Sequence, residues 1–207
     1  MNRKFVSKSN RVLRKILNSK DNLDILQDFI EVFLNKEIKE IQLNPYLQER
    51  AKNLPSEENF GIADVRIKLK TEEELNVGIQ FIDGFYAQNK MLLYYAQIHS
   101  NQLNYNDNRT PCKTVTINLL DFNYLKTENY YSKIAIPSKN ENQIELYAIE
   151  LQKFNPNGIK PKNKQEAWMI YLRGEPENAI PNILKEFNKI RKLDNLLKKY
   201  WESETME

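Results

Sequence analysis

Two neighbouring segments of the chain alternate apolar and polar residues, which is the pattern of a pair of half-buried β-strands. Every second residue is apolar in both: Val65, Ile67 and Leu69 in the first segment, and Leu75, Val77, Ile79 and Phe81 in the second. The polar run over residues 70–74 separates them and fits an antiparallel connection. The pattern therefore predicts a β-hairpin.

The polar face of this hairpin carries the candidate chemistry. Matching the two apolar faces predicts that Val65 pairs with Ile79 and that Ile67 pairs with Val77. The opposite face then collects four residues: Asp64, Asn76, Gly78 and Gln80. A carboxylate at position 78 would meet Asp64 across the strand pair, but the sequence has glycine there.

The apolar periods along the rest of the chain predict a mixture of helices and strands. Helices are expected over residues 11–18, 22–36, 88–103, 165–172 and 177–201, and strands over residues 114–122, 131–136 and 143–151. The segment 114–122 is apolar nearly throughout, which indicates a central strand covered on both faces. The buried face of the helix over 88–103 is expected to hold Leu92, Tyr95, Ala96, His99 and Leu103.

Composition limits the class of protein. The 207 residues are 41% hydrophobic and 11% aromatic, which suffices for the core of one compact domain. The single cysteine, Cys112, permits no internal disulfide, and the single histidine, His99, leaves Ser-His and Cys-His catalysis without a supporting set. No signal peptide precedes the first apolar run, and no apolar stretch approaches the roughly 18 residues that span a bilayer. We therefore expect a cytoplasmic protein with no membrane partner.

The charge is modest overall but uneven along the chain. The formal net charge is +3, yet residues 1–20 contain only basic charged side chains: Arg3, Lys4, Lys8, Arg11, Arg14, Lys15 and Lys20. Such a cluster can neutralise the phosphates of a nucleic acid. A solvated helix face is the equally good alternative on charge alone.

A series of short motifs, in a fixed order, resembles one known family. The series consists of Gly61-x-x-Asp64-Val65-Arg66, Asn76-Val77-x-Ile79-Gln80, Leu92-Leu93-Tyr94-Tyr95-Ala96 and Val115-x-Ile117-Asn118-Leu119-Leu120-Asp121-Phe122. Each motif alone is unspecific, but the ordered set resembles the PD-(D/E)XK nuclease family transposases, also called Rpn recombination-promoting nucleases. The resemblance extends from the N-terminal helix to near residue 155.

This resemblance implies an α/β fold with a restriction-endonuclease-like core, in which helices flank a mixed central sheet. The nuclease-like domain would span residues 1–155. Residues 156–207 begin with Pro156, Pro161 and a lysine-rich loop, and they would form a C-terminal helical extension packed on the same domain.

The resemblance also implies Mg²⁺-dependent DNA cleavage during recombination or mobile-element activity. Asp64 would be a catalytic residue and the metal ligand. Gln80 would take the place of the family's polar active-site residue that lies next to the catalytic base. Four basic side chains would contact the DNA: Arg11, Arg14, Lys15 and Lys90.

Three polar positions depart from the family pattern. Gly78 stands where the family has the glutamate of Glu-x-Gln or Glu-x-Lys, and Arg11 stands at the position of an aspartate in the first helix. The arginine that usually precedes Leu-Tyr-Tyr is Met91 here, or Lys90 one residue earlier. Because the apolar pattern is kept, these departures predict a degenerate active site in a retained fold.

The glycine at position 78 bears directly on metal binding. Mg²⁺ needs hard oxygen ligands, and Asp64 alone makes a weak site. Glu74 shares its face, but four residues along a strand place it about 13 Å from position 78. Asp83 reaches back only if the chain bends sharply. We therefore expect Mg²⁺ if the chain is active and no cofactor otherwise, and a bulge at Gly78 with a displaced ligand is the alternative.

The expected partner is DNA, and the sequence leaves open whether the chain forms a homo-oligomer. The alternative function is a catalytically inactive DNA-binding or protein-interaction scaffold of the same fold.

His99 is expected in the core or an interface, and the apolar stripe over 177–201 is expected to pack in the core rather than against a partner. Glu150 and Lys153 are interpreted as a surface ion pair. Paired tyrosines are expected to be buried rather than stacked on nucleic acid: Tyr94, Tyr95, Tyr130 and Tyr131.

Overall fold

The structure is a computed structural model that describes residues 12–44, 61–82, 87–100, 102, 111–136, 144–156, 158 and 160–204. Arg11, Asp83 and Leu103 lie outside these residues, so the predictions about them stay predictions. Within the described ranges, no helix is both long enough and apolar enough to cross a membrane.

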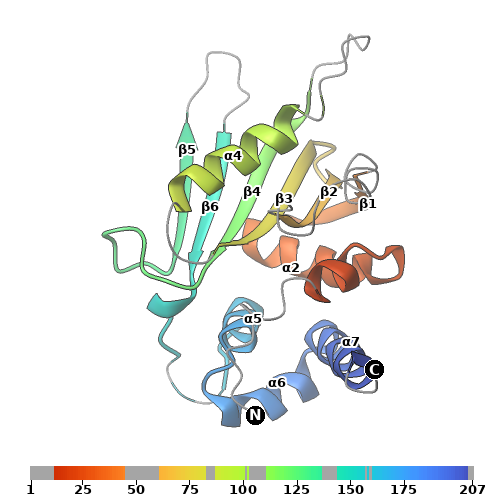
Figure 1. Cartoon of the computed structure of the whole chain (residues 1–207), viewed down its shortest axis with the longest axis vertical. Helices are drawn as coiled ribbons and strands as arrows, with labels where there is room; N and C mark the ends of the chain where they lie inside the picture. Colours follow the sequence, from red (N-terminus) through yellow and green to blue (C-terminus); the bar gives the residue numbers. More distant parts are fainter. Residues whose placement is uncertain are drawn as a thin grey trace.

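Six strands of the described chain form one mixed sheet, in the order β1-β2-β3-β4-β6-β5 (Figure 1). Their bounds are β1 (Ile38–Leu43), β2 (Gly61–Leu69), β3 (Glu74–Ile82), β4 (Lys113–Leu120), β5 (Tyr131–Ile136) and β6 (Ile144–Glu150). The β1–β2, β2–β3 and β5–β6 pairs are antiparallel, whereas β4 runs parallel to both β3 and β6. The predicted mixed central sheet is confirmed.

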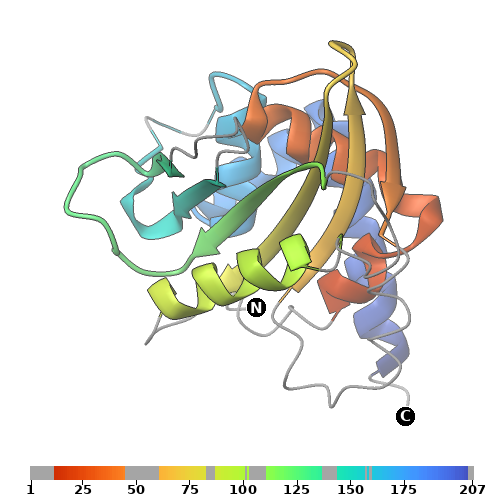
Figure 2. The same cartoon turned by 90° about the horizontal axis from the view of Figure 1, so that it is seen from above.

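Helices cover both faces of this sheet. Helix α4 (Ala87–Ser100) lies across one face, while α2 (Leu23–Leu34) and α5 (Lys164–Arg173) lie on the other (Figures 1 and 2). Two C-terminal helices pack on α2 and α5 from outside: α6 (Ile180–Glu186) and α7 (Asn188–Glu204). Residues 12–17 are also helical, and there are short 3₁₀ turns at η1 (Lys20–Asn22), η2 (Leu151–Lys153) and η3 (Glu177–Ala179).

The main core lies between the sheet and the α2, α5 and α7 helices. At its centre, Phe29 of α2 meets Trp168 of α5 edge-on, with ring centroids 5.3 Å apart. The C-terminal helices contribute buried apolar side chains at helical spacing: Ile180, Ile183, Ile190, Leu193 and Leu197. Core packing of this stripe is therefore confirmed.

Strand β4 occupies the middle of the sheet, as predicted, although its sequence alternates polar and apolar residues up to Asn118. It lies between β3 and β6, and every residue after Lys113 is buried. Helix α4 connects β3 to β4, because two parallel neighbours need a long crossover rather than a tight turn. This connection places α4 over the polar face of β2 and β3.

The hairpin of β2 and β3 forms as predicted, but its register differs by two residues. Val65 pairs with Val77 instead of Ile79, and Asp64 pairs with Gly78. Strand faces repeat every two residues, so this shift leaves the polar residues on their predicted common face.

The turn of the hairpin explains the shorter register. The Leu69 amide donates to the Glu73 carbonyl oxygen at 2.9 Å, which closes the strands earlier than the polar run suggests. Within this turn, Glu72 adopts a left-handed conformation with φ of 68°. The sequence offers no glycine or asparagine at this position to mark such a turn.

The structure corrects the prediction of elements at two places. The single helix expected over 177–201 is divided at Phe187, whose extended backbone (φ −111°, ψ 96°) separates α6 from α7. The change of direction lets Ile183 of α6 and Ile190 of α7 both reach the core. Strand β1 was not predicted, because this edge strand buries only its first residue, Ile38, and shows no clear alternation.

Candidate active site

Strands β2 and β3 place Asp64 and position 78 side by side. Asp64 and Gly78 are direct partners in the antiparallel pair, so their side-chain directions share one face. Pairing continues on the other side of β3, where Gly78 is the partner of Thr116 on β4. The alternative interpretation, a β-bulge at Gly78, is therefore wrong. The irregular pairing of β2 with β3 lies between Gly61 and Ala63.

Side chains of α4 fill the space above these strands. A Cβ atom added to Gly78 would lie 2.6 Å from Cδ1 of Ile98 and 2.8 Å from Cε1 of Tyr94. A Cβ atom on Gly61, in the neighbouring strand, would lie 2.5 Å from the Tyr94 hydroxyl. Such contacts are too close for real side chains, so both glycines are needed for the Tyr94 ring to rest on the sheet. The space where a side chain at position 78 would begin is already occupied.

The buried face of α4 differs in part from the predicted one, which included Tyr95 and His99 correctly. Four residues point towards the sheet at helical spacing: Met91, Tyr94, Tyr95 and Ile98. Leu92, which was predicted to be buried, is 41% exposed, and Ala96 is exposed as well. The helix is rotated so that the Tyr94 ring enters the space that Gly61 and Gly78 leave open. Burial of both tyrosines is confirmed.

Hydrogen bonds hold the Tyr94 ring in this position. Its hydroxyl donates to the Ala63 carbonyl oxygen at 3.0 Å and lies 3.3 Å from the Ile79 carbonyl oxygen. Burial raises the pKa of Tyr94 well above its ordinary value, and the negative charge of Asp64 adds to this effect. The hydroxyl therefore stays protonated and remains a donor.

Asp64 is a buried carboxyl group without a compensating cation among the described residues. Its side chain is 1% exposed, and neither carboxyl oxygen has a well-formed hydrogen bond to another described residue. Burial raises its pKa from 3.8 to about 7, and the nearby Asn44 side chain opposes this shift only in part. Near neutral pH, a large fraction of Asp64 is thus protonated, whereas metal binding requires the carboxylate.

Gln80 takes part in a buried polar network instead of facing an open site. Its Nε2 donates to Oδ1 of Asn118 on β4 at 2.5 Å. The Asn118 amide in turn donates to the Tyr147 carbonyl oxygen at 3.0 Å and to Thr116 Oγ1 at 3.1 Å. Sequence reasoning missed this network, although the alternation of Thr114, Thr116 and Asn118 along β4 was a signal for a second polar face.

Polar contacts also fix the C-terminal half of α4 to the sheet. Asn76 Nδ2 donates to the Ile98 carbonyl oxygen at 3.0 Å, and His99 Nδ1 lies 2.9 Å from Thr114 Oγ1. The His99 ring stacks on Tyr95, and burial lowers its pKa. His99 is therefore half-buried against the sheet, and these contacts keep Tyr94 over Gly78.

The three predicted DNA contacts that the structure describes are not gathered in one place. Arg14 Nε donates to the Gly61 carbonyl oxygen at 2.8 Å, so this side chain is engaged with β2. Lys15 contacts the hydroxyl of Tyr200 on α7 and lies 5.0 Å from the centre of its ring. Lys90 lies on α4, on the other side of the sheet from α7 (Figure 1).

Glu150 and Lys153 form a buried pair, so the prediction of a surface ion pair is wrong. Their side chains are 0% and 9% exposed, and Lys153 Nζ lies 2.9 Å from Glu150 Oε2. The other oxygen of Glu150 accepts hydrogen bonds from the backbone amides of Tyr124 and Leu125. The segment after β4 folds over the end of β6 and excludes water from the pair.

With this geometry established, comparisons with known proteins identify the family. The sequence profile described as PD-(D/E)XK nuclease family transposase matches residues 10–206. The chain belongs to this family. Its mixed α/β sheet is accordingly a restriction-endonuclease-like fold, as the resemblance implied. Comparisons with curated proteins and with solved structures find no match. The division at residue 155 stays a prediction, because the family match continues into α7.

Nucleases of this family generally use divalent metal ions, but the described residues around Asp64 do not fit one. In the ranges that the structure describes, no group of three or more histidine, cysteine, aspartate or glutamate side chains could hold a metal ion. Glu74 is paired with Arg66 at 2.5 Å and is thus engaged elsewhere. Of the carboxyl groups that the structure describes, Asp64 alone lies beneath Tyr94, and one is fewer than Mg²⁺ chemistry requires.

Proposed function

We propose that this nuclease-family protein binds DNA and does not cleave it at the Asp64 site. The observation that carries this proposal is the packing of Tyr94 and Ile98 on Gly78. The family resemblance places a glutamate at position 78, and here that place holds the side chains of α4. A degenerate active site is thus supported by an occupied space as well as by a missing ligand.

The environment of Asp64 supports the same proposal. A metal-dependent nuclease needs an ionised, accessible carboxylate with further oxygen ligands around it. Asp64 is 1% exposed, and burial raises its pKa to about 7. Gln80, at the other family position, already donates to Asn118. Neither side chain is free to organise a hydrolytic reaction.

DNA binding is the part of the family function that does not require this site. The family to which the chain belongs acts on DNA, and the fold that presents its surfaces is intact. The net charge of +3 is compatible with contacts to phosphate. A protein that retains the fold and loses the carboxylate keeps its binding surfaces.

The proposal predicts that the purified chain does not nick supercoiled plasmid DNA in Mg²⁺ or Mn²⁺. Gel analysis should show that the unmodified chain produces no more nicked plasmid than the Asp64→Asn variant does. This variant is the matched isosteric control. Fluorescence anisotropy with labelled duplex DNA should show binding that weakens as salt rises. Nicking by the unmodified chain that Asp64→Asn abolishes would overturn the loss of cleavage, and no duplex binding at low salt would overturn the DNA-binding part.

A further inference from the structure

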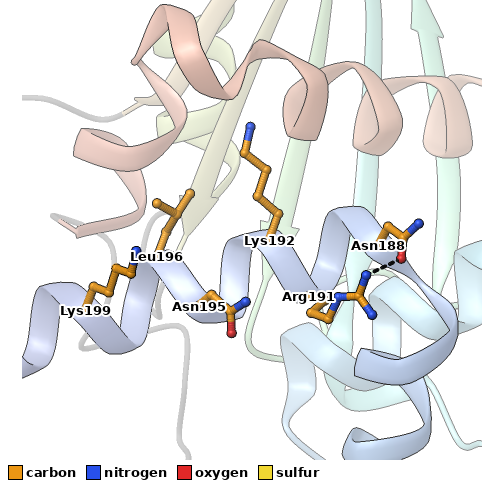
Figure 3. A pocket seen from close by; sticks show the side chains of 6 residues that line it. All are labelled: Asn188, Arg191, Lys192, Asn195, Leu196 and Lys199. Atoms are coloured by element: carbon orange, nitrogen blue, oxygen red, sulfur yellow. Dashed lines mark hydrogen bonds between the residues drawn. The ribbon is translucent and has the colours of Figure 1, made fainter.

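The solvent-facing side of α7 carries a set of basic and amide side chains. A hollow of about 300 Å³ is lined by six residues of this one helix (Figure 3): Asn188, Arg191, Lys192, Asn195, Leu196 and Lys199. Their spacing of three, four or seven residues places them along one side of the helix. We call this set the α7 basic face. Five of its six members are hydrogen-bond donors, and three of these are cations.

The charge of the α7 basic face is only partly compensated. Lys192 pairs with Asp24 at 2.6 Å, and Arg191 donates to the amide oxygen of Asn188. For the residues that the structure describes, no carboxylate lies within ion-pair distance of Arg191 or Lys199. Positive charge is therefore available to a ligand at both ends of the hollow.

The acidic residue within this stretch of α7 points elsewhere. Asp194 is 2% exposed, accepts a hydrogen bond from the Tyr171 hydroxyl, and pairs with Lys198 at 2.7 Å. It thus belongs to the core side of the helix and does not reduce the positive potential of the hollow by direct pairing.

We propose that the α7 basic face binds the phosphate backbone of duplex DNA, an inference that rests on the DNA binding proposed above. Arginine, lysine and asparagine donors are the usual partners of phosphate oxygens. From Asn188 to Lys199 the helix rises about 17 Å, a length over which duplex DNA presents several backbone phosphates. Donors at the two ends of the face can therefore contact different phosphates.

The composition of the face favours nucleic acid over a protein partner. Leu196 is the only apolar residue that lines the hollow, and it is partly buried against the core. The centre of a protein interface is usually apolar and depleted of charge. A polyanion with regularly spaced phosphates suits this surface better.

The α7 basic face is separated from Asp64 by the sheet. Helix α4, with Tyr94, covers one face of the sheet, whereas α7 lies behind α2 on the other (Figures 1 and 2). Closure of the site at Gly78 therefore leaves α7 unaffected. The arrangement explains how DNA binding can persist where cleavage is lost.

The test compares two double variants of the full chain with equal charge loss. Arg191→Gln with Lys199→Gln removes two cations from the α7 basic face, and Lys126→Gln with Lys160→Gln removes two exposed cations elsewhere. Anisotropy titrations with labelled duplex DNA should show roughly 10-fold weaker binding for the α7 variant. Its slope of log affinity against log salt should be lower by about 2. The control variant should stay within about twofold of the unmodified chain.

The outcomes separate this inference from the proposed function. If the unmodified chain does not bind duplex DNA, DNA binding itself fails. If it binds and both double variants lose affinity equally, the assignment of DNA binding to the α7 basic face is wrong, while DNA binding itself stands. Equal competition by polyglutamate, at matched charge, would also overturn a phosphate-specific face. Circular dichroism and thermal unfolding of each variant show whether a loss of affinity reflects a loss of fold.

Discussion

Replacing Asp64 with asparagine is expected to stabilise the fold by about 3–4 kcal/mol at pH 8 and to have little effect near pH 4. Burial raises the pKa of Asp64 from 3.8 to about 7. Between these values the folded chain binds more protons than the unfolded chain, so stability is lost as the pH rises through this range. Asparagine has nearly the same shape and no charge to bury, so the variant avoids this loss.

Urea unfolding at several pH values measures this effect directly. Asp121→Asn makes the same substitution at an exposed position and is the matched control. Burial lowers the pKa of His99, so both proteins lose stability as the pH falls below about 6.5, and this loss cancels in the comparison. An Asp64→Asn protein that is less stable than the unmodified chain at pH 8 would contradict the prediction. Stabilisation by Mg²⁺ of the unmodified chain alone would show that Asp64 binds the ion.

The faces of the central hairpin could be predicted, but its register could not. Side-chain direction depends only on alternation, which is clear in both strands. Register depends on the turn, where Glu72 takes a left-handed conformation that the sequence does not signal. The error of two residues preserved the faces, so Asp64 and Gly78 were correctly placed together although their partners were misassigned.

The occupied space above Gly78 could not be predicted, because it depends on the rotation of α4. The sequence has two adjacent tyrosines, and only tertiary packing decides which of them enters the site. One signal was present. Gly61 and Gly78 lie on neighbouring strands of a chain with 5 glycines in all. Two strand glycines on one face indicate the close approach of a large group, here the Tyr94 ring.

The division between α6 and α7 had no local signal either. The residue at the division is Phe187, whereas a helix end is usually marked by glycine or proline, and the apolar stripe continues across it. Packing on α2 sets the direction of α7, so this boundary depends on contacts far apart in the sequence. The helix expected over 177–201 already places the α7 basic face opposite the apolar stripe, but only the structure shows that Lys192 pairs with Asp24.

Gly78→Glu alone is expected to destabilise the fold by at least about 4 kcal/mol and to leave metal binding absent. The smaller change Gly78→Ala should already cost about 1–3 kcal/mol, because its Cβ meets the fixed ring of Tyr94 and the tip of Ile98. Glutamate adds a longer side chain and a second carboxyl group beside Asp64, with no described cation to compensate it. Urea unfolding and calorimetric titration with Mn²⁺ measure the two effects.

A double-mutant cycle tests whether the Tyr94 ring causes the cost. Tyr94→Ala alone leaves a cavity and should cost about 3–5 kcal/mol. Combined with Gly78→Ala, it should cost less than the sum of the single changes by about 1–3 kcal/mol, because the clash with the ring is then absent and only the flexible tip of Ile98 has to move. Additive costs would refute the steric role of Tyr94. If Mn²⁺ binding appears in Gly78→Glu with Tyr94→Ala but not in Gly78→Glu, the closed site is a reversible consequence of one aromatic ring, and Asp64 has kept its capacity to bind metal.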